Sequence, residues 1–196
     1  MKPLRLAVLA SGGGSNFQSI IDAVEGGELD STIECLISNK EDAYALERAR
    51  KHKIKDIYIA AKDPKDSRSY DERLLSTLEE VDPDLIVLAG YLKIISAEMI
   101  DRYPGQIINI HPSLLPKYGG KGCYGIHVHK AVLEAGDKVS GATVHYVDKG
   151  IDTGEIILQK SVEVLETDTA KTLQERVLKE VEHKIYVEAI KKIANT

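Results

Sequence analysis

The sequence predicts a three-layer, Rossmann-like α/β fold with a mainly parallel sheet and an antiparallel hairpin near its C-terminal end. Two observations carry this prediction. Short apolar runs alternate along the chain with longer segments whose apolar residues recur at helical spacing. Near the end, two strand-like segments follow one another with only a turn-rich loop between them, as in a hairpin.

The first half of the chain alternates buried strands with amphipathic helices. Residues 4–10 form an apolar run of the kind found in buried parallel strands, and the apolar side chains after them recur at helical spacing. Ser15 and Gln18 fit a capping box, so we expect that helix to begin at Ser15. The same criteria predict strands at residues 33–38, 56–60 and 84–89 and helices at residues 43–51, 66–80 and 97–103.

The second half opens with an apolar strand at residues 107–110, and a short helix is expected at residues 130–134. Residues 139–146 alternate apolar and polar side chains, which predicts a half-exposed antiparallel strand paired with residues 155–164. Apolar residues then recur every four positions, which predicts a last helix at residues 168–194.

Length and composition are those of a small globular protein. We expect the 196 residues to form one domain, residues 1–196, and the hydrophobic fraction of 43% suffices for its core. A net charge of −5 argues against nucleic acid or an anionic membrane as a partner, since both bind basic surfaces. Two cysteines are too few for a disulfide framework. Because the sequence has neither a signal peptide nor a membrane-length apolar run, we expect a cytoplasmic, soluble enzyme. We further expect a monomer or homodimer with small-molecule substrates.

A glycine-rich loop at residues 11–16, Ser-Gly-Gly-Gly-Ser-Asn, separates the first strand from its helix. Glycines let a ligand approach the backbone, and the N–H groups of a helix N-terminus favour negative charge. The loop lacks the Lys-Ser/Thr of a Walker A motif and the Gly-x-Gly-x-x-Gly spacing, so we predict that it binds a monophosphate. The alternative is a tight strand-to-helix turn without a ligand.

Asn109 and His111 mark the end of the strand at residues 107–110. Strand alternation places both on the same side, and Pro112 and Pro116 prevent the strand from continuing. Ligands of open α/β sheets bind at the carboxyl ends of strands. An amide beside an imidazole at this position predicts a catalytic site, and the alternative is a core histidine beside a turn-forming asparagine.

Residues 109–116, Asn-Ile-His-Pro-Ser-Leu-Leu-Pro, resemble the hallmark of the formyltetrahydrofolate-dependent formyltransferases, and the resemblance extends over nearly the whole chain. It implies that 10-formyltetrahydrofolate is the co-substrate and that its formyl group passes to the primary amine of glycinamide ribonucleotide in purine biosynthesis.

His127 and His129 could begin a zinc site, but no cysteine or acid completes the set, so we expect no metal.

The resemblance also implies roles for residues that bind the two substrates. The phosphoribosyl end of the ribonucleotide would be held by Gly14, Ser15 and Asn16. Its amino end would lie near Glu182, although the spacing from Arg176 is one residue longer than in the family, and a partly solvated Glu-His pair is the alternative. The folate would contact a set of residues that comprises Arg68, Leu92, Lys93, Ile94, Ile95 and Asn109. On the residues alone, Arg68 is a solvated charge, and the apolar segment could instead be buried against the fold.

Asp152 matches the family carboxylate that lies beside the catalytic imidazole, although on its own it is compatible with an ordinary turn. The reaction requires stabilisation of a tetrahedral oxyanion and movement of protons from the amine to the departing folate nitrogen. Asn109 can donate to the oxyanion, and protonated His111 can do the same and then deliver a proton. Asp152 would orient His111 and favour its charged form.

Three other functions are compatible with parts of the sequence. Methionyl-tRNA formyltransferase shares the motif but carries a further C-terminal domain and needs a basic face for tRNA, whereas we expect this acidic chain to end after one domain. Formyltetrahydrofolate hydrolase carries an N-terminal regulatory domain, whereas this chain starts at its first strand. A Rossmann-type binding module without catalysis would leave Asn109, His111 and Asp152 without a role.

The loop at residues 117–125 also departs from the family's commonest form, which is shorter and contains a proline.

Overall fold

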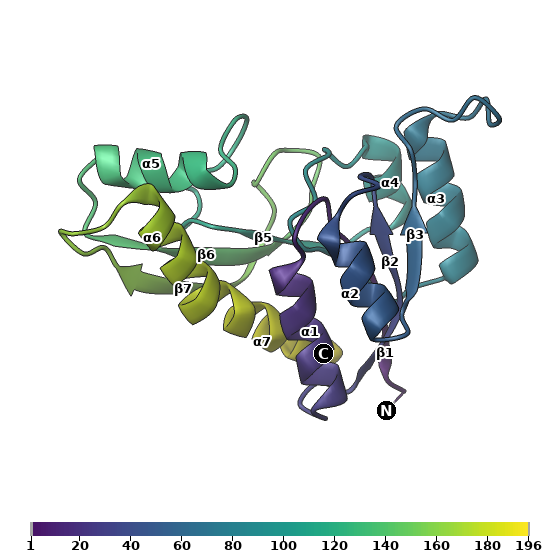
Figure 1. Ribbon diagram of the computed structural model, residues 1–196, viewed down its shortest axis with the longest axis horizontal. Coiled ribbons are helices and arrows are strands. Elements are labelled where there is room, and N and C mark those ends of the chain that lie inside the picture. Colours follow the sequence, from purple (N-terminus) through teal and green to yellow (C-terminus); the bar gives the residue numbers. More distant parts are fainter. Residues whose placement is uncertain (1, 196) are drawn as a thin grey trace. The chain divides into compact units, whose positions relative to one another are not determined.

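The computed structural model describes residues 2–195, and seven strands of this part of the chain form one sheet in the order β3-β2-β1-β4-β5-β6-β7 (Figure 1). β1 pairs in parallel with β2 and β4, and β2 with β3, whereas β6 and β7 are antiparallel, so the predicted fold class is confirmed. The strands are β1 (Leu4–Leu9), β2 (Ser31–Ser38), β3 (Lys55–Tyr58), β4 (Leu85–Leu88), β5 (Ile107–His111), β6 (Val139–Tyr146) and β7 (Ile156–Glu163).

The helices alternate with the strands through the first half of the chain. They are α1 (Ser15–Glu25), α2 (Tyr44–Lys51), α3 (Tyr70–Val81), α4 (Ala97–Arg102), α5 (Ile126–Glu134), α6 (Ala170–Arg176), the π-helical segment η1 (Val177–Glu182) and α7 (His183–Ala194). Within residues 2–195 no helix is long and apolar enough to cross a membrane. The chain divides into two compact units, one ending at Ile108 and the other beginning at Asn109, so the single domain stays a prediction.

β1 is the centre of the first unit. It pairs with β2 on one side and β4 on the other, and its residues Leu6 to Leu9 have no exposed surface. α1 and α2 lie side by side (Figure 1), and both contact β2. Phe17 and Ile20 of α1 and Leu46 of α2 are buried, as their helical spacing predicts.

The N-terminal ends of two helices in the first unit differ from the prediction, one in its cap and one in its first residue. α1 does begin at Ser15, but its N-cap is Gly14 in a left-handed conformation and no side chain caps the helix, so the predicted capping box is wrong. α3 begins at Tyr70 rather than at residue 66. The side chain of Ser69 accepts the N–H of Glu72, whose carboxylate accepts the N–H of Ser69, and this capping box ends the preceding loop.

The hairpin of β6 and β7 forms the sheet part of the second unit. β6 is buried from Ser140 to His145, so the prediction of a half-exposed strand is wrong. η1 and α7 contact β6, and the loop after β5 lies against it through the side chain of Leu114 and the N–H of Leu115. These tertiary contacts bury the polar residues of β6 as well. The alternation of apolar and polar residues along β6 therefore does not predict which side chains are exposed.

The last helix and the short helix before β6 also differ from the prediction. The continuous helix expected to the C-terminal end is divided into α6, η1 and α7. A π-helical turn holds more residues than an α-helical turn, which accounts for the longer spacing between Arg176 and Glu182. α5 begins at Ile126, so His127 and His129 lie on the helix rather than in the loop before it.

Candidate active site

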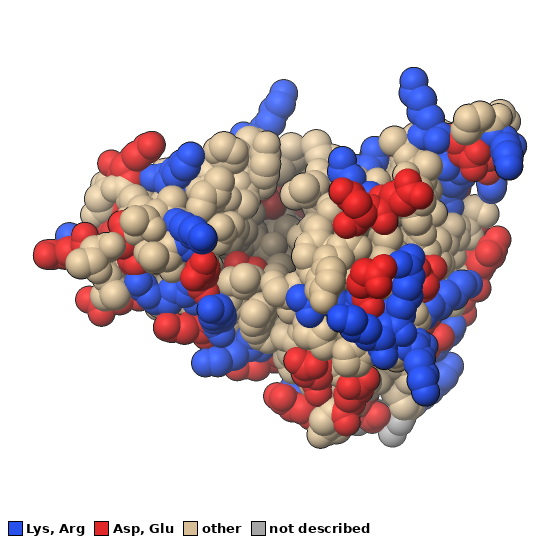
Figure 2. Space-filling view, in the orientation of Figure 1, with Lys and Arg blue, Asp and Glu red and all other residues tan. Residues whose placement is uncertain are grey.

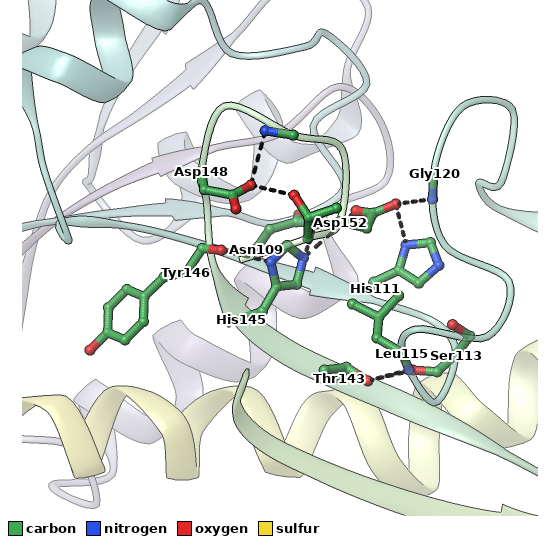
Figure 3. A network of polar contacts seen from close by, with 12 residues as sticks. Asn109, His111, Ser113, Leu115, Gly120, Thr143, His145, Tyr146, Asp148 and Asp152 are labelled. Atoms are coloured by element: carbon green, nitrogen blue, oxygen red, sulfur yellow. Dashed lines mark hydrogen bonds and ion pairs between the residues drawn. The ribbon is translucent and has the colours of Figure 1, made fainter. Parts of the chain in front are cut away.

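The loop that follows β5 is held against the hairpin by one threonine of β6. The hydroxyl of Thr143 donates to the carbonyl of Ser113 at 2.6 Å and accepts the N–H of Leu115 at 3.1 Å (Figure 3). The side-chain amide of Gln159 in β7 donates to the same hydroxyl oxygen at 2.8 Å. Thr143 has no exposed surface, so these bonds are shielded from water and keep the chain beyond His111 in place.

His111 is buried at the end of β5, and both of its ring nitrogens have partners. Nε2 donates to the carbonyl of Tyr118 at 2.7 Å, because a carbonyl oxygen can only accept. Nδ1 faces Oδ2 of Asp152 at 3.4 Å (Figure 3). Both contacts are favourable together only when both nitrogens carry protons, so the geometry suits the imidazolium form.

Asp152 lies in the loop between β6 and β7, and its side chain is only 11% exposed. Oδ2 accepts the N–H of Gly120 at 3.0 Å, and Oδ1 lies 3.7 Å from Nε2 of His145. Burial by itself raises the pKa of Asp152. The hydrogen bonds from His145 and Gly120 and the charge of His111 outweigh burial, so the pKa lies below its ordinary value. The site therefore contains an ionised carboxylate between two histidines.

A different aspartate stabilises the turn between β6 and β7. Oδ1 of Asp148 accepts the N–H of Gly150 at 3.0 Å and the hydroxyl of Thr153 at 2.6 Å, the pattern of an Asx turn. Asp152 instead adopts a φ of 58°, a left-handed value that aspartate tolerates, and its carboxylate is directed toward the histidines (Figure 3). The contacts of Asp152 are thus not those of a turn residue.

His145 joins Asn109 to this carboxylate and is not among the site residues predicted from the sequence. Nδ1 of His145 donates to the carbonyl of Tyr146 at 2.8 Å. Nε2 lies 3.3 Å from Nδ2 of Asn109, so it accepts that N–H when the ring is neutral and donates to Asp152 when the ring is charged. The signal that could have revealed His145 is its position on β6, directly before the loop that carries Asp152.

Burial has the largest effect on the pKa of His111. Desolvation lowers this pKa below its ordinary value, while the charge of Asp152 and the hydrogen bond to the carbonyl of Tyr118 act in the opposite direction. The neighbouring His145 lowers it further. Asp152 thus favours the charged form, as the sequence analysis expected, but its effect is smaller than that of burial.

His129 of α5 is another buried histidine of the second unit. Within residues 2–195 neither of its ring nitrogens has a hydrogen-bond partner. Burial, with a smaller effect from the charge of His111, lowers the pKa of His129 to about 4. His127, in contrast, is exposed. In the described part of the chain no group of three or more His, Cys, Asp or Glu residues is arranged to hold a metal ion.

In the first unit, the glycine loop leads directly into the N-terminus of α1. Gly14 has a φ of 67°, and its carbonyl accepts the N–H of Gln18 at 2.9 Å. Ser15 and Asn16 are the first two residues of α1, where backbone N–H groups point out of the helix. A helix N-terminus of this form can bind an anion. Gly14, Ser15 and Asn16, which the resemblance assigns to the phosphoribosyl group, are the N-cap and first two residues of this helix.

The apolar segment after β4 is exposed to solvent at two large side chains. Leu92 is 64% exposed and Ile94 is 72% exposed, while Ile95 is buried. Exposure of two such side chains in one short segment favours contact with a ligand over burial against the fold. The N–H of Leu92 donates to the hydroxyl of Ser11 at 2.9 Å, so one backbone group of this segment already has a partner.

Lys93 and Arg68, both assigned to folate binding by the resemblance, have partners within the first unit. Nζ of Lys93 lies 4.3 Å from the centre of the Tyr70 ring. Arg68 is exposed and pairs with Asp66 at 2.7 Å, and its hydrogen bonds lower the pKa of that carboxyl to about 2. These contacts are those of surface charges, so the structure supplies no independent sign of a ligand at Arg68.

Glu182, the last residue of η1, is buried at 7% exposure. Burial, with a smaller effect from the charge of Glu182, raises the pKa of Tyr186. The carboxylate therefore lies in the interior of the second unit rather than in a solvated Glu-His pair.

The sequence as a whole matches a family model described as formyl transferase over residues 4–190. The chain belongs to the formyl transferase family. This formyl transferase is 40% identical over 183 residues to the phosphoribosylglycinamide formyltransferase of Escherichia coli (strain K12), which covers 93% of this chain and 84% of that protein. It is 45% identical over 188 residues to the chloroplastic phosphoribosylglycinamide formyltransferase of Arabidopsis thaliana, but spans only 64% of that protein's length.

A crystal structure shares the fold of this formyl transferase over its whole length. The phosphoribosylglycinamide formyltransferase of Brucella melitensis aligns with a TM-score of 0.90 and 38% sequence identity, over 100% of this chain and 97% of that chain. Because the two sequences are 38% identical, their similarity goes beyond a common fold and agrees with membership of one family.

Proposed function

We propose that this formyl transferase transfers the formyl group of 10-formyltetrahydrofolate to the primary amine of glycinamide ribonucleotide, a step of purine biosynthesis. The observation that carries the proposal is the cluster in which His111 and His145 flank the carboxylate of Asp152 and Asn109 contacts His145. The names of the relatives from Escherichia coli and Arabidopsis thaliana support the same reaction.

The chemistry follows from the charge that develops during acyl transfer. The amine attacks the formyl carbon, and the formyl oxygen becomes an oxyanion until the bond to the folate nitrogen breaks. Asn109 has two side-chain N–H groups, and only one of them faces His145. The second N–H can donate to the oxyanion, and Nε2–H of His111 can do the same once it exchanges the carbonyl of Tyr118 for the substrate.

Protons must leave the attacking amine and reach the departing folate nitrogen. His111 is the group of the cluster that can carry them, because imidazole can both give and accept a proton near neutral pH. Asp152 remains ionised and stabilises the charged imidazole from the Nδ1 side. No covalent intermediate with the protein and no metal is required. Once His111 has given its proton to the departing folate nitrogen, the neutral imidazole or a water molecule can accept the proton of the amine.

The binding roles are part of the same proposal. Gly14, Ser15 and Asn16 hold the phosphate of the ribonucleotide at the N-terminus of α1. The exposed segment from Leu92 to Ile95, with Arg68, contacts the folate, and Glu182 contributes to the amine end. We also propose that the protein acts in the cytoplasm, as a monomer or homodimer, and has no nucleic-acid partner; the relative from Arabidopsis thaliana is chloroplastic.

An assay that follows both substrates tests the proposal. The protein is incubated with 10-formyltetrahydrofolate, with and without glycinamide ribonucleotide, and formate and formylated amine are measured separately. Formylated amine that accumulates only with the ribonucleotide is the expected result. Release of formate without the amine would identify a hydrolase instead. Formylation of methionyl-tRNA but not of the ribonucleotide would assign the chain to the tRNA-modifying branch of the family.

A further inference from the structure

We propose that Arg48 of α2 is a positioning residue for anion binding by the glycine loop: it orients the loop peptides and supplies a positive charge that pairs with no carboxylate within residues 2–195. The inference rests on the proposed function, in which this loop holds the phosphate of the ribonucleotide. It adds a residue from a different helix, which neither the glycine motif nor the family resemblance assigned to the site.

Two successive carbonyl groups of the loop are directed toward α2. The N–H of Ala45 donates to the carbonyl of Gly12 at 3.0 Å, and Nε of Arg48 donates to the carbonyl of Gly13 at 2.8 Å. In a trans peptide the N–H points opposite to the C=O of the same plane. The N–H groups of Gly13 and Gly14 therefore point away from α2, on the side from which an anion would meet the loop.

Arg48 also ties the loop to the first turn of α1. Its Nη1 donates to Oε1 of Gln18 at 2.8 Å, and Nε2 of Gln18 donates to Oδ1 of Asp22 at 2.8 Å, which fixes the orientation of the amide. One planar guanidinium thus bonds the loop and the helix that follows it. Since anion binding at a helix N-terminus needs several N–H groups held toward one point, this bridge preorganises the site.

The loop lies so close to α2 that its shape depends on that helix. A Cβ atom added at Gly14 would lie 2.8 Å from Cβ of Ala45 and 3.6 Å from Cδ of Arg48. Gly12 and Gly13, in contrast, have nothing within 4 Å of an added Cβ. One side of the loop is therefore packed against α2 and the other side is open, which is the arrangement that a backbone anion site requires.

The charge of Arg48 is uncompensated, unlike that of its neighbour Arg50. Figure 2 shows basic side chains gathered over α2. Arg50 pairs with Glu47 and, at 2.8 Å, with Asp56. Arg48 has only neutral acceptors and the ring of Tyr44, 4.9 Å away, and within residues 2–195 no carboxylate forms an ion pair with it. An anion on the open side of the loop would be attracted by this positive charge across the loop peptides.

The experiment compares Arg48→Met and Arg48→Lys with Arg50→Met, a control that removes the same charge from the same helix. Calorimetry gives the Kd of the full chain for glycinamide ribonucleotide and for the corresponding nucleoside without phosphate. We expect Arg48→Met to raise the Kd for the ribonucleotide about tenfold or more and to leave that for the nucleoside unchanged. Arg50→Met should change neither by more than about twofold.

The lysine variant separates position from charge. Arg48→Lys keeps the charge but lacks the planar guanidinium that bonds the carbonyl of Gly13 and the side chain of Gln18 at the same time. The affinity of this variant for the ribonucleotide should therefore stay about fivefold or more below that of the original protein. Full recovery with lysine, or equal weakening by Arg50→Met, would overturn the inference. So would unchanged binding in a folded Arg48→Met protein. If the original protein itself binds ribonucleotide and nucleoside equally, the phosphate assignment of the proposed function fails instead.

Discussion

Nδ1 of His111 lies 3.4 Å from Oδ2 of Asp152, and the same carboxylate oxygen accepts the N–H of Gly120. The imidazole is fixed on its other side by the carbonyl of Tyr118. Two backbone groups of one glycine-rich loop thus contact the two members of the proposed acid–base pair.

Replacing Asp152 with asparagine keeps the shape of the side chain but removes its charge. The pKa of His111, already lowered by burial, should fall further, because the carboxylate is the larger of the two influences that raise this pKa, the other being the carbonyl of Tyr118. Activity that needs protonated His111 is lost as pH rises through this pKa, so that limb of the pH–rate profile should move to lower pH. At neutral pH we expect kcat to fall by roughly two to four orders of magnitude. A loss below about tenfold with an unmoved profile would return Asp152 to the role of a turn residue.

Alanine at Asn109 or at His111 should each lower kcat by about a hundredfold or more, the usual effect of losing an oxyanion donor or a general acid. Both residues lie at the end of β5, so we expect the variants to fold, which circular dichroism can check. His127→Ala serves as the control, since that histidine is exposed on α5 and should be dispensable. Near-normal turnover in a folded His111→Ala protein would contradict the mechanism.

Two glycines of the phosphate loop should respond differently to valine. At Gly13 an added Cβ meets nothing within 4 Å, so Gly13→Val should fold and raise the KM for the ribonucleotide, with little effect on folate affinity. At Gly14 the left-handed backbone and the contact with Ala45 add strain, so Gly14→Val should be destabilised by about 1–3 kcal/mol or more. Urea unfolding and steady-state kinetics of both variants measure the contrast. Unchanged kinetics for Gly13→Val would argue that the loop is only a turn.

The two cysteines should differ in their reaction with thiol reagents. Cys35 lies in β2 without exposed surface, and burial raises the pKa of its thiol to about 12. Cys123 lies in the glycine-rich loop and is partly exposed. We expect Cys123 to react first and Cys35 only on unfolding, which mass spectrometry after timed labelling can resolve, with Cys123→Ser as the control. Faster labelling of Cys35 would mean that β2 opens more readily than that loop.

Stability should fall at acid pH because of His129. Its pKa is about 4 in the folded protein and near 6.5 in the unfolded chain. The unfolded state therefore binds the proton first, and stability is lost as pH falls from about 6.5 to about 4, by up to about 3 kcal/mol. Urea unfolding between pH 7 and pH 4.5 measures this loss. In His129→Phe the loss should be smaller than in the original protein, and equal losses in both would exclude His129 as the cause.

The sequence alone was sufficient where local patterns carry the information. Apolar runs and helical stripes predicted the strands and most helices, since burial of such patterns is what stabilises these elements. Strand alternation and two prolines identified Asn109 and His111 at a strand end, and the structure brings both into contact with the residues around Asp152. These features depend on residues close together in the sequence or on a motif, so they can be predicted from the sequence alone.

Tertiary structure alone decided the partners of these residues. His145 comes to Asn109 from a strand 36 positions away, and the carbonyl of Tyr118 reaches His111 because Thr143 and its neighbours hold the loop. Likewise, Arg48 meets the glycine loop because α2 packs beside α1. No periodicity encodes such contacts. They depend on how separate elements pack, and packing also determines the burial that lowers the pKa of His111.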